Sequence, residues 1–66
     1  MNEWLTLHDG ETVYYVNVNN IRYMNPTVVD GVECTSISFV GGFIIVDEDL
    51  ETIKRMIQNT MQFKLS

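Results

Sequence analysis

The chain has 66 residues and a net charge of −5, from nine acidic and four basic side chains. A chain of this length is expected to form a single small domain over residues 1–66, whose core supplies only roughly 3–5 kcal/mol unless disulfides, metals or oligomerisation add to it. The negative charge argues against binding to nucleic acids and to anionic membranes, because such proteins need a basic surface that faces phosphate.

The first third of the chain has the pattern of a β-hairpin. Residues 4–8 predict a first strand, with leucines at alternate positions on one face. Asp9-Gly10 follows between apolar runs, and this pair favours a two-residue turn because glycine accepts a positive φ. A second strand is predicted over residues 12–16 or 12–17, and the asparagine-rich residues 17–20 predict a tight turn or a single helical turn.

The middle of the chain predicts two further strands. Residues 21–24 form the third, which we expect Asn25-Pro26 to end because proline cannot donate a hydrogen bond to a ladder. Residues 27–32 contain a second Asp-Gly pair and either extend the third strand or begin the fourth. Residues 33–40 alternate in polarity and predict the fourth strand.

After the fourth strand the periodicity of the sequence changes. A Gly-Gly turn precedes a fifth strand over residues 43–46. From Leu50 to Ile57, apolar residues then recur at steps of three and four, which indicates an amphipathic helix. Asp47 or Asp49 can cap the first amides of this helix, and the acids around them favour its positive end.

These elements predict an α+β fold. We expect a five-stranded antiparallel β-meander over residues 4–46, because every connection is short. One C-terminal amphipathic helix, over about residues 49–62, packs on one face of the sheet.

No motif in the sequence indicates catalysis or a bound cofactor. His8 and Asp9 are neighbours on a strand, so their side chains point to opposite faces. Cys34 lies in mid-strand, without a helix terminus to lower its pKa, and its predicted role is a small packed residue. The acids over residues 47–51 lack the spacing of a calcium loop and are better explained by helix capping. The sequence predicts no catalytic residue, no cofactor and no metal site.

The cellular location is predicted from three features. A single cysteine fits a reducing compartment. We find no basic start followed by an apolar stretch, and no apolar run approaches the roughly 20 residues that cross a bilayer. The expected location is the cytoplasm.

Two of the strands are apolar on both faces. Successive strand residues point to opposite sides of a sheet, so Tyr14 and Val16 face away from the side chains of Val13 and Tyr15. The strand over residues 43–46 has the same character. One helix covers one face of a sheet, so the other face needs a second cover. We therefore predict a homo-oligomer, with a dimer as the default because two-fold symmetry is the commonest.

The predicted contact residues lie on one of these two faces. The pattern does not decide which face the helix covers. If the even-numbered side is uncovered, the expected contacts are the following four residues: Tyr14, Val16, Ile44 and Val46. Trp4 and Phe63 are secondary candidates, because aromatic residues are enriched in protein interfaces.

Several short segments resemble the small flagellar FlbD family. The matching positions are a leucine-threonine start, a hairpin turn, a strand ending in asparagine, and a final strand followed by a capped helix: Leu5-Thr6, Asp9-Gly10, Tyr15-Val16-Asn17, Ile21, Ser36-Ile37-Ser38-Phe39, Gly42, Ile45-Val46, Glu48 and Asp49-Leu50-Glu51-Thr52-Ile53. The chain departs from the family pattern at His8, where the family has an apolar residue, and at Val18, where proline is usual. The resemblance implies a small cytoplasmic, non-enzymatic protein that acts through contacts with other proteins, without a cofactor.

The expected function is therefore protein–protein interaction. The chain is predicted to be a small adaptor or structural accessory protein of a flagellar, phage or mobile-element system. The alternative is a regulatory module that binds a small molecule in an apolar pocket between the helix and the sheet.

Overall fold

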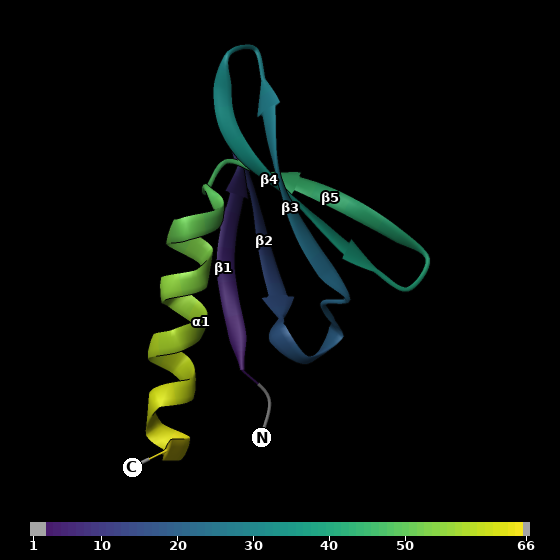
Figure 1. Ribbon diagram of the computed structural model, residues 1–66. Coiled ribbons are helices and arrows are strands. Elements are labelled where there is room, and N and C mark those ends of the chain that lie inside the picture. Colours follow the sequence, from purple (N-terminus) through teal and green to yellow (C-terminus); the bar gives the residue numbers. More distant parts are fainter. Residues whose placement is uncertain (1–2, 66) are drawn as a thin grey trace.

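The computed structural model describes residues 3–65, and the side chains of residues 3–59 among them. The elements follow one another in the order strand, strand, short 3₁₀-helix, three strands and helix: β1 Trp4–Asp9, β2 Thr12–Asn17, η1 Val18–Asn20, β3 Tyr23–Val29, β4 Val32–Phe39, β5 Gly42–Val46 and α1 Leu50–Leu65 (Figure 1). All strand pairs are antiparallel, and α1 packs beside the strands. The predicted α+β class, with five antiparallel strands and a C-terminal helix, is confirmed.

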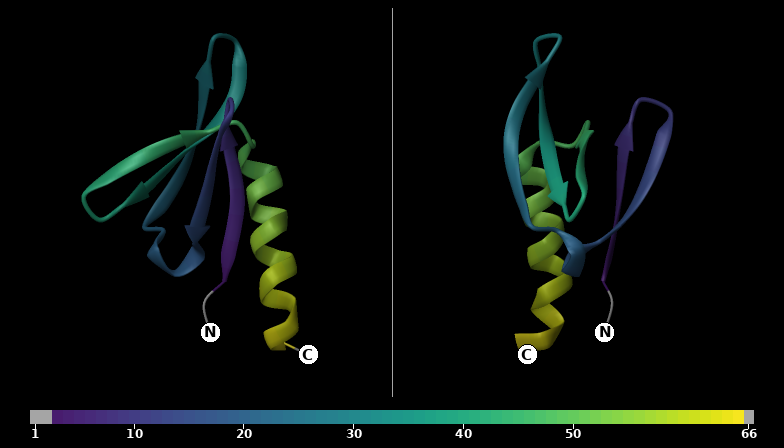
Figure 2. Two further views of the ribbon diagram at one scale, coloured as in Figure 1. Left: turned by 180° about the vertical axis from the view of Figure 1, so that it is seen from behind. Right: turned by 90° about the vertical axis from the view of Figure 1, so that its right-hand side faces the viewer.

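The five strands divide into two sheets. One sheet holds β1 and β2, and the other holds β3, β4 and β5. In the chain segment between the two sheets, Asn17 caps the start of η1. Its side-chain Oδ1 accepts a hydrogen bond from the amide of Asn19 at 2.9 Å. This turn separates β2 from β3, so these two strands do not pair. Seen from the side, the β1–β2 hairpin stands apart from the three-stranded sheet (Figure 2).

The two sheets are joined at the end of β5. The amide of Asp47 donates to the carbonyl of His8 at 2.6 Å, so β5 lies beside β1. This bond joins only the ends of β1 and β5, so the two sheets stay separate and enclose a common interior. Within the described chain, β3 and β5 are the edge strands of the three-stranded sheet, and β2 has one side that no strand pairs with.

The β3–β4 hairpin turns as its sequence predicts. Asp30 has φ of 51° and Gly31 has φ of 79°, the two positive values that a type I′ turn requires. The β1–β2 turn is displaced by one residue from the prediction. Gly10 and Glu11 form its centre, and Gly10 has φ of 60° at the first central position, as in a type II′ turn.

The predicted end of the third strand at Asn25-Pro26 is wrong. β3 continues through Pro26 to Val29, with Pro26 opposite Thr35. A proline fits here because β3 is an edge strand, where an amide that points outward has no ladder partner to lose.

The core lies between the two sheets and α1. Its buried apolar members come from β1, β2, β4, β5 and α1: Leu5, Leu7, Val16, Ile37, Val46 and Ile53. The inner faces of the sheets therefore cover each other, and α1 closes one side of the space between them (Figures 1 and 2). An oligomer is not needed to cover these faces.

This arrangement corrects the predicted uncovered face. Val16 is 5% exposed and Val46 is fully buried, so neither can meet a second molecule. Tyr14 and Ile44 are half-buried and pack against the same core. The even-numbered side is therefore not the uncovered one, because the second sheet covers it within the monomer.

Helix α1 begins at a side-chain cap. The carboxylate Oδ1 of Asp49 accepts a hydrogen bond from the amide of Thr52 at 2.9 Å, which confirms one of the two predicted caps. Replacing Asp49 with alanine should lower the melting temperature, because this amide then loses its partner. Asp49→Asn should lower it less, since asparagine is also a good cap. Thermal unfolding followed by circular dichroism compares the two, and equal losses would contradict the capping role.

Candidate functional site

The large apolar side chains outside the core form the candidate functional surfaces. They are exposed on outer sheet faces and at hairpin turns: Trp4, Val13, Tyr15, Tyr23, Val28, Val29, Val32, Val40 and Phe43. Scattered single apolar residues are normal on a protein surface, but grouped ones often mark a binding site. Three groups can be recognised from the strand registers.

The first group lies on the outer face of the β1–β2 sheet. Tyr15 is opposite Thr6, and Trp4 is opposite Asn17, so Trp4 and Tyr15 are diagonal neighbours on one face. They are 58% and 71% exposed, and Val13 lies on the same face. We call Trp4, Val13 and Tyr15 the hairpin face.

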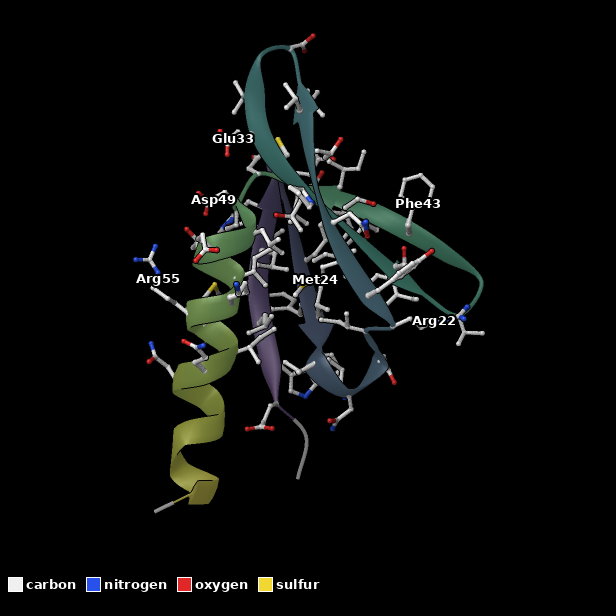
Figure 3. The ribbon with its side chains drawn as sticks, viewed as in Figure 1. Arg22, Met24, Glu33, Phe43, Asp49 and Arg55 are labelled. Atoms are coloured by element: carbon white, nitrogen blue, oxygen red, sulfur yellow. The ribbon has the colours of Figure 1, made fainter. Side chains whose placement is uncertain are left out.

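The second group lies on the outer face of the three-stranded sheet. Ser38 of β4 is opposite Tyr23 of β3 on one side and Phe43 of β5 on the other. Tyr23 is 56% exposed and Phe43 is 65% exposed. Figure 3 shows Phe43 projecting from β5, away from α1. We call Tyr23, Ser38 and Phe43 the aromatic row.

The third group occupies the tip of the β3–β4 hairpin. Val29 pairs with Val32 beside the turn, and Val28 precedes them; all three are exposed. This tip projects beyond the rest of the fold (Figure 1). Three valines on a projecting hairpin supply an apolar contact of small area.

The predicted contact residues and these groups coincide only at Trp4. Phe63 lies outside the residues whose side chains are described. Tyr15, Tyr23 and Phe43 are exposed but are not among the predicted contact residues. The alternation of the strands placed Tyr15 and Phe43 together on the odd-numbered face, so the signal existed, but the sequence does not say which face is covered.

A polar contact connects the β1–β2 hairpin to the β5–α1 loop. The backbone amide of His8 donates to Oε1 of Glu48 at 2.9 Å, and its ring Nδ1 lies 2.6 Å from Oε2. The amide of Gly10 donates to the Asp47 carboxylate at 2.8 Å. The hydroxyl of the buried Thr35 donates to the carbonyl of Glu48 at 2.8 Å. Helix capping was expected to explain every acid here, but Asp47 and Glu48 bond to the hairpin instead.

The environment of Glu48 shifts its titration. Burial raises the pKa of this carboxyl, but the hydrogen bonds from the His8 ring and backbone outweigh that effect, and the pKa is lowered from its ordinary value of 4.5. The hydrogen bond from Thr52 lowers the pKa of Asp49 in the same way. Both acids therefore stabilise the folded chain in their charged forms.

Removal of the Glu48 carboxylate should destabilise the protein at neutral pH. Glu48→Ala leaves the amide and ring of His8 without this partner, and we expect a loss of about 1–2 kcal/mol in the free energy of unfolding, from the value of hydrogen bonds to charged groups. Urea unfolding at pH 7 measures the loss. A stability equal to that of the unmodified protein would mean that the contact contributes nothing.

The same contact should make stability depend on acid pH. As pH falls below 4.5, the unfolded chain takes up a proton on Glu48 before the folded chain does, so the free energy of unfolding falls with pH. The contribution of Glu48 to the free energy of unfolding is complete well above pH 4.5. It is lost once the pH falls below the lowered pKa of the folded chain. Glu48→Gln should flatten part of this slope, with Asp49 supplying another part. Urea unfolding over a series of acid pH values tests the sign.

The other reactive side chains have structural surroundings. Cys34 is buried, and its thiol lies 3.6 Å from the carbonyl of Val32. Among the described side chains, no three His, Cys, Asp or Glu residues lie together as a metal site would need. In the described part of the chain, α1 is too short and too polar to cross a bilayer.

A surface cleft of about 430 Å³ lies between η1 and the β4–β5 turn. Its walls combine apolar side chains with two asparagines and one arginine: Asn19, Asn20, Ile21, Arg22, Phe39 and Val40. This cleft is not the pocket predicted between the helix and the sheet, a region that holds the fully buried Leu7, Val46 and Ile53. The cleft at η1 is a candidate site for a small ligand.

Comparisons were made with protein-family models, with curated proteins and with solved structures, and none of them matches this chain. The resemblance to the FlbD family rests on the sequence segments quoted for it.

Proposed function

We propose that the protein is a small non-enzymatic interaction protein, which associates with itself and with other proteins through the outer faces of its sheets. The observation that supports this function most is the aromatic row. Two aromatic rings, each more than half exposed, flank Ser38 on one face. Such rings bring a large contact area to an interface at little entropic cost, and they are enriched in protein interfaces.

The charge distribution supports the same function. The aromatic row contains no charged residue, whereas the described acids lie mainly at turns and at the start of α1. An uncharged centre with a polar surround is the usual anatomy of an interface, and a net charge of −5 keeps the free chain in solution. An accessory role in a larger assembly, as the resemblance to the flagellar FlbD family implies, agrees with this surface.

Site-specific crosslinking tests the proposal. A photoreactive phenylalanine analogue replaces Phe43, and the matched control carries the analogue at Lys54, an exposed position on α1. We expect a discrete crosslinked partner from position 43 in the native cell, and none from position 54. Tyr23→Ser in the same chain should weaken this crosslink, because Tyr23 belongs to the same row. No crosslink from position 43, or equal products from both positions, would overturn the proposal.

A second candidate function is supported by the cleft at η1. Its walls hold three apolar side chains, two asparagines and Arg22, and the Arg22 side chain has no ion-pair partner among the described residues. This combination suits a small carboxylate with an apolar body. A thermal-shift screen of such acids against their uncharged amides tests the idea. Stabilisation by an acid but not by its amide, and its loss in Arg22→Gln, would favour a small-molecule module over the interaction protein.

A further inference from the structure

β2 belongs to the two-stranded sheet, whereas β3 and β5 are the edge strands of the three-stranded sheet. β3 carries Pro26 in its middle, and proline on an edge strand prevents another strand from adding to it. β2 carries neither proline nor a charged side chain between Thr12 and Asn17. β1 lies on one side of β2, and no strand of the described chain pairs with the other side. Natural sheets rarely leave an apolar edge in this state.

The register of the hairpin shows which backbone groups of β2 point outward. Asp9 and Thr12 flank the two-residue turn, so they form the first hydrogen-bonded pair of the ladder. Hydrogen-bonded and non-hydrogen-bonded pairs then alternate. Val13 and Tyr15 belong to non-hydrogen-bonded pairs with β1, so their amides and carbonyls point to the open edge of β2.

We infer that the open edge of β2 pairs antiparallel with the same edge of a second copy of this chain, about a two-fold axis through Tyr14. This inference rests on the self-association in the proposed function and specifies how it occurs. Val13 of each copy is then opposite Tyr15 of the other, and these two pairs exchange about four backbone hydrogen bonds. Val13 and Tyr15 share the exposed outer face, so the pairing matches apolar side chains with apolar side chains.

Two observations identify the occupant as a second copy. In the two-fold register, Glu11 of one copy lies opposite Asn17 of the other copy. No like charges therefore meet across the paired strands, although each chain has a net charge of −5. The β1–β2 sheet has only two strands, which is marginal for a sheet in water. Pairing across the edge doubles it into a continuous sheet of β1, β2 and their two symmetry mates.

Proline at an outward-pointing amide tests this mode of pairing. Val13→Pro removes one edge donor, and the monomer should tolerate it because that amide has no partner in β1. Val13→Thr is the matched control, since threonine keeps the amide and the β-branched shape. Sedimentation should give twice 7.6 kDa for the unmodified chain and for Val13→Thr, and 7.6 kDa for Val13→Pro. Circular dichroism shows whether the proline variant is folded.

Hydrogen exchange gives a second readout that needs no variant. The amides of Val13 and Tyr15 should exchange roughly tenfold or more slowly at protein concentrations where the dimer forms than where the chain is monomeric. Unchanged exchange at these amides, or a Val13→Pro variant that still sediments as a dimer, would overturn the edge pairing and leave self-association itself standing. A chain that stays monomeric at every concentration would also overturn the edge pairing. Crosslinking from position 43 tests separately whether the protein binds other proteins.

Discussion

Replacing Val46 with aspartate should unfold the protein. Val46 is fully buried, pairs with Thr35 in β4 and belongs to the core that contains Ile53. A carboxylate at this position either loses its hydration without a partner or takes up a proton, and both cost several kcal/mol. The whole core of such a small domain supplies only roughly 3–5 kcal/mol. We therefore expect Val46→Asp to lack the circular dichroism of a folded chain at 25 °C.

The matched control is the same substitution on the same strand. Phe43 is 65% exposed and lies on the opposite face of β5. Phe43→Asp should lower the free energy of unfolding by about 1 kcal/mol or less, a value set by strand propensity. Urea unfolding compares the two variants. A folded Val46→Asp that splits an oligomer would restore the even-numbered side as the contact face and contradict the arrangement of two facing sheets.

The local features of the fold could be predicted from the sequence. The Asp30-Gly31 turn, the cap at Asp49 and the helical period after it are set by residues close in sequence, and the structure has them where they were expected. The extension of β3 through Pro26 was missed. Whether proline ends a strand depends on whether that strand is at an edge, which short-range patterns do not show.

The covered face could not be predicted in the same way. Alternation in β2 and β5 separated Val16 and Val46 from Tyr15 and Phe43 correctly, but it gave two equivalent faces. Which face is covered depends on the turn at η1, which brings the second sheet over the first. A pattern with a period of two gives no information about how sheets pack on each other.

The polar contact between hairpin and loop was also beyond local reasoning. Glu48 lies forty residues after His8 in the sequence, and they meet only because the end of β5 lies beside β1. The acids near the start of α1 were all assigned to capping, yet only Asp49 is shown to cap the helix. A side chain with two plausible local roles cannot be assigned without knowing its distant neighbours.

Replacing Ile53 with alanine should remove most of the stability of the protein. Ile53 is the one fully buried residue described on α1, and it contacts the same core as the inner faces of both sheets. Truncating a buried isoleucine to alanine costs about 2–5 kcal/mol, from lost burial and from the cavity that remains. Alanine favours helix more than isoleucine does, so the loss reports packing rather than helix propensity.

Lys54→Ala is the control for this prediction, because Lys54 is the next residue and is exposed. Its ion pair with Glu51 spans 3.3 Å on the surface, and we expect its removal to cost at most about 0.5 kcal/mol. Urea unfolding of both variants measures the difference, and amide exchange in β4 shows whether the sheets survive without the helix. If Ile53→Ala were as stable as Lys54→Ala, the two sheets alone would form the core, and α1 would be free to leave them when a partner binds. A large loss at Ile53 instead makes α1 a permanent part of the fold, which leaves the outer sheet faces and the edge of β2 as the surfaces for partners.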